Sequence, residues 1–236
     1  RIVRDIAGPG HTTGYLSRQI AIRSGGVPLF AEELTRSVVD RLRTEGETLD
    51  EDTLAEIFSA IPDTLHSLLE ARLDRLGDDK IVAQMASVIG RTFTLSLLER
   101  ILHVPDKARL PETIGRLRSA GYIYPIDSND GEAYAFKHTL VQDAAYASLT
   151  NERKSTLHQT VAETLETQFP EITSSQPELL AYHFSQTPLY MKALTYWGRA
   201  GKRGVGRSAY LEALEHLGAA LKLVDRQADD PRVEAQ

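Results

Sequence analysis

The chain has 236 residues, of which 42% are hydrophobic, and it carries a formal net charge of −6. This length is enough for one large domain or for two to three small ones, each with its own hydrophobic core. A net negative charge argues against general affinity for nucleic-acid backbones or anionic membranes, because both need an excess of basic residues.

The sequence contains no cysteine, which excludes disulfides, thiolate metal sites and cysteine nucleophiles. No apolar run approaches the roughly 20 residues of a membrane helix, and no signal peptide is visible. We therefore expect a cytoplasmic protein with no membrane contact. Because the chain begins at Arg1 in the middle of a helical pattern, we also expect it to be a piece of a longer protein.

The first part of the sequence predicts helices over residues 15–24 and 29–43. The second carries one apolar stripe at helical spacing, made of Leu29, Phe30, Leu34, Val38, Val39 and Leu42. Between the two helices, SGGVP predicts a turn, since glycines end helices and Pro28 suits the first turn of a helix. A polar loop is expected over 43–53, and a further helix after the start signals Pro62 and Asp63.

Residues 79–149 predict three helices followed by a β-hairpin. Its strands are YIYPI and AYAF, joined by the turn-forming DSNDGE. This order is that of a winged helix, a domain that often binds DNA through its third helix. That helix offers Arg109, Arg116 and Arg118 but also Glu112, without a basic stripe. We therefore favour a role inside the protein and keep a winged-helix, DNA-binding transcription regulator as the alternative.

From residue 151 onward the pattern is helical and similar to that of tetratricopeptide (TPR) repeats. One frame, starting at Leu194, fills the repeat positions with Trp197, Ala200, Gly201, Ala213, Leu217 and Ala220. A second frame, starting at Ser174, shares with it a helix near 189–206. About one and a half repeats result, fewer than the roughly three that a stable array needs, so we expect more repeats beyond Gln236.

Five blocks of the sequence carry a resemblance to a known family. They are GGVPLFAEELTRSV, IPDTLHSLLEARLDRL, VAQMASVIGRTFTLSLLERIL, YAFKHTLVQDAAYASL and PELLAYHF. In this order they resemble the carboxy-terminal part of STAND-type (AAA-type) signal-transduction ATPase modules. Such modules are often joined to class III adenylate or guanylate cyclase domains, LuxR-type regulators or protein kinases, and the cyclase-associated members resemble this chain most.

The resemblance implies a mainly α fold in three parts. Residues 1–60 would be a helical lid, 61–149 a winged-helix domain with a small β-hairpin, and 150–236 the start of TPR-like helical repeats. A P-loop core would precede the lid and hold ATP or ADP with Mg²⁺. The implied partners are this absent core, the output domain of the parent chain, and a protein or small-ligand signal on the repeats.

The phosphate-binding motif of the core, G-x-x-x-x-G-K-[ST], does not occur in this sequence. GPGHTTG at 8–14 has no lysine in place and no strand before it, so it predicts a turn. We therefore expect no catalytic residue and no ATP hydrolysis by this chain, although the resemblance implies that the parent is an ATPase of the kind often fused to a nucleotide cyclase. The leading hypothesis is a regulatory fragment of an ATP/ADP-dependent switch.

The first candidate nucleotide-binding residue implied by the resemblance is Pro28. Gly26, Val27 and Pro28 match the Gly-x-Pro motif of the lid, whose proline packs on the nucleotide. Many relatives have asparagine where Val27 stands, which leaves the polar part of that contact open. The alternative is an ordinary proline in the first turn of a helix.

The second candidate nucleotide-binding residue is His138, which follows a strand-like run and precedes a helix. His138 and Leu140 match a Met-His-Asp motif and the leucine after it, and the motif's histidine reaches the β-phosphate of ADP. An imidazole donates hydrogen bonds and a helix start favours an anion, so His138 would act as a latch and not as a catalyst. The alternative is a structural histidine that bonds local backbone groups.

Other constellations in the sequence do not indicate an active or metal site. Glu32 and Glu33 are adjacent, so they point in different directions and make a poor acid/base pair. The remaining histidines lack the i, i+4 spacing of a helical metal site, and we expect no metal of the chain's own. Tyr196 and Trp197 lie on repeat positions, which favours core packing over a ligand cage.

Overall fold

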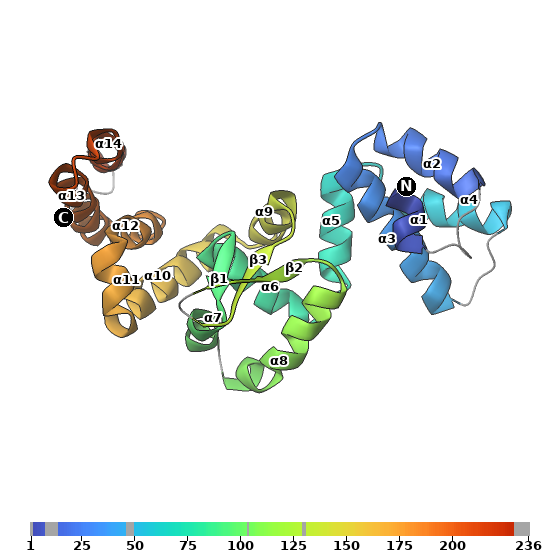
Figure 1. Cartoon of the computed structure of the whole chain (residues 1–236), viewed down its shortest axis with the longest axis horizontal. Helices are drawn as coiled ribbons and strands as arrows, with labels where there is room; N and C mark the ends of the chain where they lie inside the picture. Colours follow the sequence, from blue (N-terminus) through green and yellow to red (C-terminus); the bar gives the residue numbers. More distant parts are fainter. Residues whose placement is uncertain (1, 8–13, 46–49, 103, 129–130, 229–236) are drawn as a thin grey trace. The chain divides into compact units, whose positions relative to one another are not determined.

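The computed structural model describes residues 2–7, 14–45, 50–102, 104–128 and 131–228 (Figure 1). The chain divides into two compact units, Arg1–Lys80 and Ile81–Gln236. Most described residues are helical, and one small antiparallel sheet lies in the second unit. The prediction of a mainly α fold is therefore confirmed. The predicted turn at 8–14 lies outside the described residues except for Gly14, which begins a helix.

The first unit consists of helices that enclose a common apolar core. They are α1 (Ile2–Ala7), α2 (Gly14–Ser24), α3 (Pro28–Glu45), α4 (Glu51–Ala60) and α5 (Leu65–Asp74). The stripe predicted on α3 is buried from Phe30 through Leu34 and Val38 to Leu42, where it packs with Leu54 and other apolar residues. Side chains spaced three and four residues apart share one helix face, which explains why this stripe was visible in the sequence.

The loop predicted over 43–53 is wrong at both ends. Helix α3 continues to Glu45, and α4 begins at Glu51. The side chain of Asp50 accepts a hydrogen bond of 2.8 Å from the backbone N–H of Thr53, which is the usual N-cap arrangement. The acidic residues after Asp50 are favourable in a first helical turn, so the polar composition at 50–53 marks a helix start.

Helix α5 also begins later than the predicted start signals. Thr64 is its N-cap, and its hydroxyl accepts a hydrogen bond of 3.2 Å from the N–H of Ser67. Pro62 and Asp63 therefore precede the helix. The leucines at 68, 69 and 73 form the buried face of this helix.

The second unit begins with helices around a three-stranded sheet. In chain order the elements are α6 (Asp79–Ile89), β1 (Thr92–Thr94), α7 (Leu95–Ile101), α8 (Val104–Ser119), β2 (Ile123–Ile126), β3 (Ala133–Phe136) and α9 (Thr139–Ala147). The predicted hairpin is confirmed, because β2 and β3 pair antiparallel with Ile123 opposite Phe136. Helix α8 passes through Pro111 on its exposed side, where water can satisfy the freed carbonyl.

Strand β1 was not predicted from the sequence. It pairs with the other edge of β3, so the strand order is β1-β3-β2 and β3 is central. The ring of Phe93 on β1 stacks near that of Tyr134 on β3, with 6.1 Å between centroids. Three residues are too few to display an alternating pattern, and this strand is held by a partner distant in sequence.

The remainder of the second unit is a helical array. It contains α10 (Asn151–Gln168), α11 (Pro170–Ser175), α12 (Pro177–Ser185), α13 (Tyr190–Gly206) and α14 (Tyr210–Ala228), and the helix predicted near 189–206 is α13. Helix α13 packs against both α12 and α14 (Figure 1). A Cβ atom on Gly204 would lie 3.0 Å from the Cβ of Ala213, so the glycine permits the close approach of α13 and α14.

No helix in the described ranges combines the length and the apolar character that a membrane crossing requires.

Candidate functional site

Pro28 is the first residue of α3 and follows a tight glycine turn. Gly25 and Gly26 have φ angles of 55° and 79°, values that glycine adopts without strain. The N–H of Val27 donates to the carbonyl of Ser24 at 2.9 Å, which closes the turn. The two glycines and the fixed φ of proline thus determine where α2 ends and α3 begins.

Pro28 lines a groove of about 780 Å³ in the first unit. Its wall is formed by Val3 on α1, by Ile20 and Ala21 on α2, and by the start of α3. Arg4 and Asp5 of α1 bring one basic and one acidic side chain to this groove, and most of the exposed lining is apolar. A volume between 300 and 1,000 Å³ with an apolar lining and few polar groups is typical of small-molecule sites.

A buried ion pair fixes α3 relative to α5 in the same unit. The carboxylate of Glu33 contacts the guanidinium of Arg72, and the two side chains are 3% and 6% exposed. The neighbouring Glu32 instead pairs with Arg36, one turn along α3, at 3.0 Å. The two glutamates therefore point to separate partners, as their adjacency predicted.

His138 is the N-cap residue of α9, so the prediction that it precedes a helix is confirmed. Its backbone is extended, and its carbonyl accepts the hydrogen bond of Val141 at 3.0 Å, while its side chain does not cap the helix. The N–H of Lys137 donates to the carbonyl of Tyr122, which attaches the junction to the start of β2. The imidazole is half-buried at the point where the central strand leads into a helix.

Pro28 belongs to the first unit and His138 to the second. The role that the resemblance gives to the two residues remains a prediction.

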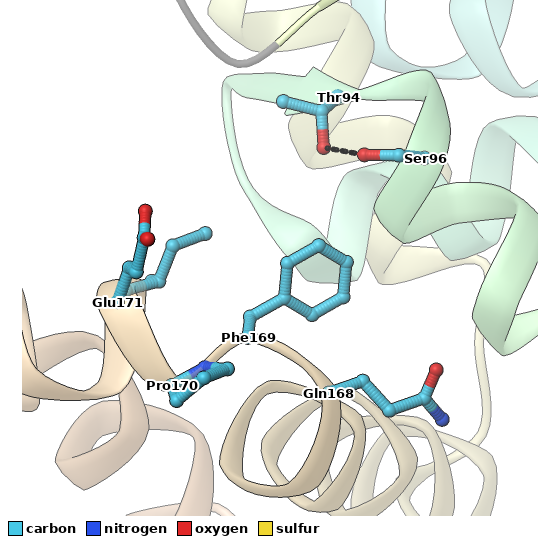
Figure 2. Close-up of a pocket in the computed structure, with 7 residues that line it drawn as sticks. Thr94, Ser96, Gln168, Phe169, Pro170 and Glu171 are labelled. Carbon is cyan, nitrogen blue, oxygen red and sulfur yellow. Dashed lines mark hydrogen bonds between the residues drawn. The ribbon is translucent and has the colours of Figure 1, made fainter.

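A smaller cavity of about 360 Å³ lies in the second unit, between the start of α7 and the junction of α10 and α11 (Figure 2). Figure 2 shows the phenyl ring of Phe169 projecting toward Thr94 and Ser96, whose hydroxyls are hydrogen-bonded at 3.2 Å. The guanidinium of Arg100 lies 5.3 Å from the centroid of the same ring. Thr94 also caps α7, so these hydroxyls hold a helix start in place.

A buried histidine pair lies where side chains of α9, α10 and α12 meet in the second unit. The Nδ1 atoms of His158 and His183 are 2.8 Å apart, and Nε2 of His158 lies 3.0 Å from the hydroxyl of Tyr146. Neither imidazole is accessible to solvent. Two Nδ1 atoms at this distance share one proton, so one neutral ring donates to the other.

The environment of His183 indicates which ring donates. Within the described part of the chain, Nε2 of His183 is buried without a hydrogen-bond partner. A buried acceptor without a partner is tolerated better than a buried N–H without one. This favours the tautomer in which Nδ1–H of His183 donates to His158, whose Nε2–H then donates to Tyr146.

Both histidines are neutral at neutral pH. Burial, together with the charge of Lys154, lowers the pKa of His158 to about 4. Burial and the charge of His158 lower the pKa of His183 to about 3. The pair is therefore a hydrogen-bonded link between helices and not a positively charged site.

Sequence reasoning missed this pair. The histidines stand on different helices and share no helical spacing, so only an estimate of burial at each position could have pointed to them. Among the residues that the structure describes, no three histidine, aspartate or glutamate side chains form a group that could hold a metal ion.

No protein-family model matches this chain, and no solved structure matches it. The chain is similar to an uncharacterized protein of Rhizobium meliloti (strain 1021), with 31% identity over 212 residues. The matched stretch is 90% of this chain and 20% of the relative, so the chain spans about a fifth of the relative's length.

Proposed function

We propose that this chain is the regulatory part of an ATP/ADP-dependent signal-transduction switch of the STAND type, with a class III nucleotide cyclase as its output. In this proposal residues 1–60 form the helical lid, residues 61–149 a winged-helix domain, and residues 150–236 the start of a sensor of TPR-like repeats. The observation that carries the proposal is the groove at Pro28, which has the size and lining of a small-molecule site.

The groove fits the apolar half of a nucleotide better than its phosphates. Val3, Ala21 and Pro28 offer a surface against which an adenine ring can pack. The charged side chains on the groove wall are one cation, Arg4, and one carboxylate, Asp5, so the wall supplies no net positive charge for phosphates. The phosphates and Mg²⁺ would be held by the P-loop core, which this chain does not supply. When bound, ATP supplies the phosphoanhydride whose state the switch reads. The part of Pro28 and its neighbours is to orient the base and to exclude water from it.

The order of elements from α6 to α9 supports the winged-helix assignment. A strand follows the first helix, two helices come next, and a hairpin then adds the other strands of the same sheet. In this arrangement His138 stands at the start of α9 with a half-buried imidazole. An imidazole at a helix start can donate a hydrogen bond to an anion, so His138 would hold the closed, ADP-bound state.

The packing of the last helices supports a repeat array. Gly201 and Gly204 of α13 face α14, where a Cβ on Gly201 would lie 2.7 Å from the side chain of Leu217. Helix α14 carries a row of exposed apolar residues at alternating spacings of four and three, in which Leu217 also contacts α13: Tyr210, Leu214, Leu217, Leu221 and Val224. Such a row is typical of a helix face that packs on a further helix.

Replacing His138 by alanine should speed the release of ADP from the longer protein that the proposal requires. Loss of one hydrogen bond to a charged group weakens binding by about 1.5–3 kcal/mol, or roughly ten- to hundredfold in rate if association is unchanged. Release can be followed by displacement of a fluorescent ADP analogue. The exposed neighbour Thr139, replaced by alanine, is the control and should leave release unchanged. An unaltered rate in the His138 variant would remove this residue from the mechanism.

The alternative function, DNA binding, rests on the exposed Arg116 and Arg118 in the last turn of α8. Arg116 lies 3.6 Å from the carboxylate of Glu112 and also bonds the hydroxyl of Thr113, so part of this charge is already engaged. We expect no electrophoretic shift of duplex DNA at low salt. A salt-sensitive shift that is lost when both arginines are changed to glutamate would support the transcription regulator instead.

A further inference from the structure

A groove of about 250 Å³ lies among α12, α13 and α14 of the helical array. Its floor contains the buried Leu223, and its aromatic residues are Tyr182 and Trp197. Trp197 is held in one orientation, because its indole N–H donates to the hydroxyl of Ser185 at 3.0 Å and its ring stacks on His216. Tyr182 is 46% exposed. The groove therefore presents a rigid apolar and aromatic surface that is open to solvent.

The charge at this groove is opposite to that of the chain as a whole. Lys222 and Arg226 line it from α14, four residues apart on the same helix face, and both are exposed. No aspartate or glutamate lines it. Within the described residues neither cation belongs to an ion pair. In a chain of net charge −6, this is a local site for an anion beside an aromatic surface.

We infer that this groove binds an acidic peptide segment of a protein partner, with an aromatic side chain seated beside Trp197 and carboxylates on Lys222 and Arg226. Arginine recognises carboxylates through paired N–H donors, and aromatic residues provide the apolar contact. The volume is below the range of small-molecule sites and suits one inserted side chain. Nucleic acid would need a longer basic track than two cations.

This inference deepens the proposed sensor role of the helical array, where the peptide would be the incoming signal. Its test uses the 236-residue chain without nucleotide, so binding at the groove and the nucleotide switch can fail independently of each other.

The experiment uses an unlabelled peptide, Glu-Glu-Phe-Glu-Glu, with blocked ends. Trp197 is the sole tryptophan of the chain, so its intrinsic fluorescence reports directly on the groove. We expect a saturable change at low salt that weakens as salt is added, because exposed charges are screened. The neutral peptide Gln-Gln-Phe-Gln-Gln and the peptide Glu-Glu-Gly-Glu-Glu should each bind at least about tenfold more weakly.

Charge-reversal variants locate the site. Changing Lys222 and Arg226 together to glutamate should abolish the fluorescence change, and both positions are exposed, so the fold should be retained. The matched control changes Lys202 and Arg207, two exposed cations of α13 and its C-cap that do not line the groove, and should bind as the unaltered chain does. Circular dichroism checks the helicity of both variants.

Three results would overturn the inference. They are no saturable change with the acidic peptide at low salt, equal binding of the acidic and neutral peptides, and equal loss in the groove and control variants. Tighter binding of a single-stranded oligothymidylate than of the peptide would assign the groove to nucleic acid instead. The peptide comparison is made on the unaltered chain and therefore decides the matter even if a variant does not fold.

Discussion

Replacing Glu33 by glutamine is expected to lower the free energy of unfolding of the first unit by about 3–5 kcal/mol. The substitution removes the negative charge of a pair whose side chains are only 3% and 6% exposed. The guanidinium of Arg72 then stays positive where water hardly reaches it. Domains are commonly stable by about 5–15 kcal/mol, so a loss of this size should cause partial unfolding.

The adjacent glutamate provides a matched control. Glu32 pairs with Arg36 on the same helix at 3.0 Å, and these side chains are 18% and 25% exposed. Its change to glutamine should destabilise the unit by only about 0.3–0.5 kcal/mol, as for other pairs one helical turn apart. The two variants have the same composition and differ only in which carboxylate is lost.

Hydrogen exchange read by mass spectrometry distinguishes the two units in one experiment. In the Glu33 variant, peptides from α3 and α5 should exchange faster, while peptides from the second unit serve as an internal reference. A second variant, with Glu33 changed to leucine and Arg72 to methionine, should regain most of the protection, because apolar residues of similar volume can replace a buried ion pair. Equal effects of the Glu32 and Glu33 substitutions would contradict the prediction.

The ion pair of Glu33 is a feature of the first unit that could not be predicted from the sequence. The apolar stripe of α3 was predicted because it depends on the helical repeat alone. The ion pair was not, because Arg72 lies on another helix and nothing in the local pattern connects the two residues. For the same reason the hairpin of β2 and β3 was predicted from its turn, whereas β1, which joins the sheet from a distance, was missed.

In the candidate sites too, local features were predicted from the sequence and contacts between distant residues were not. The helix starts at Pro28 and at the residue after His138 were predicted, since proline and strand-to-helix junctions have local signals. The groove around Pro28 depends on three helices, and the groove beside Trp197 depends on three others. Trp197 was expected to be a core residue. The structure places Tyr196 in the core and gives Trp197 a half-buried position at a groove.

The buried histidines should make the second unit lose stability as the pH falls from about 7.5 to about 5. In the unfolded chain both rings take up protons near pH 6.5, whereas in the folded chain their pKa values are about 4 and about 3. The unfolded state therefore binds more protons in this window, and lowering the pH favours it. Each histidine contributes about 2 kcal/mol by pH 5, and the pair up to about 4 kcal/mol.

The charged and titratable groups around the histidine pair determine the pH range in which this test can be made. Lys154 lies over the ring of Tyr146, 4.7 Å from its centroid, and Tyr182 contacts both histidines edge-on. Lysine stays positive and tyrosine neutral between about pH 5 and pH 7.5, and most carboxylates titrate below it. The change in stability over this range is therefore assigned to histidine.

Urea unfolding followed by the fluorescence of Trp197, which lies in the same unit, measures the effect at each pH. A double variant with His158 changed to glutamine and His183 to leucine keeps a hydrogen-bond donor toward Tyr146 and removes both titrating rings. Its free energy of unfolding should be nearly flat over the window, whatever its value at neutral pH. If the double variant kept the slope of the unaltered chain, the protons would be binding elsewhere, and the neutral histidine pair would not be the source of the acid sensitivity.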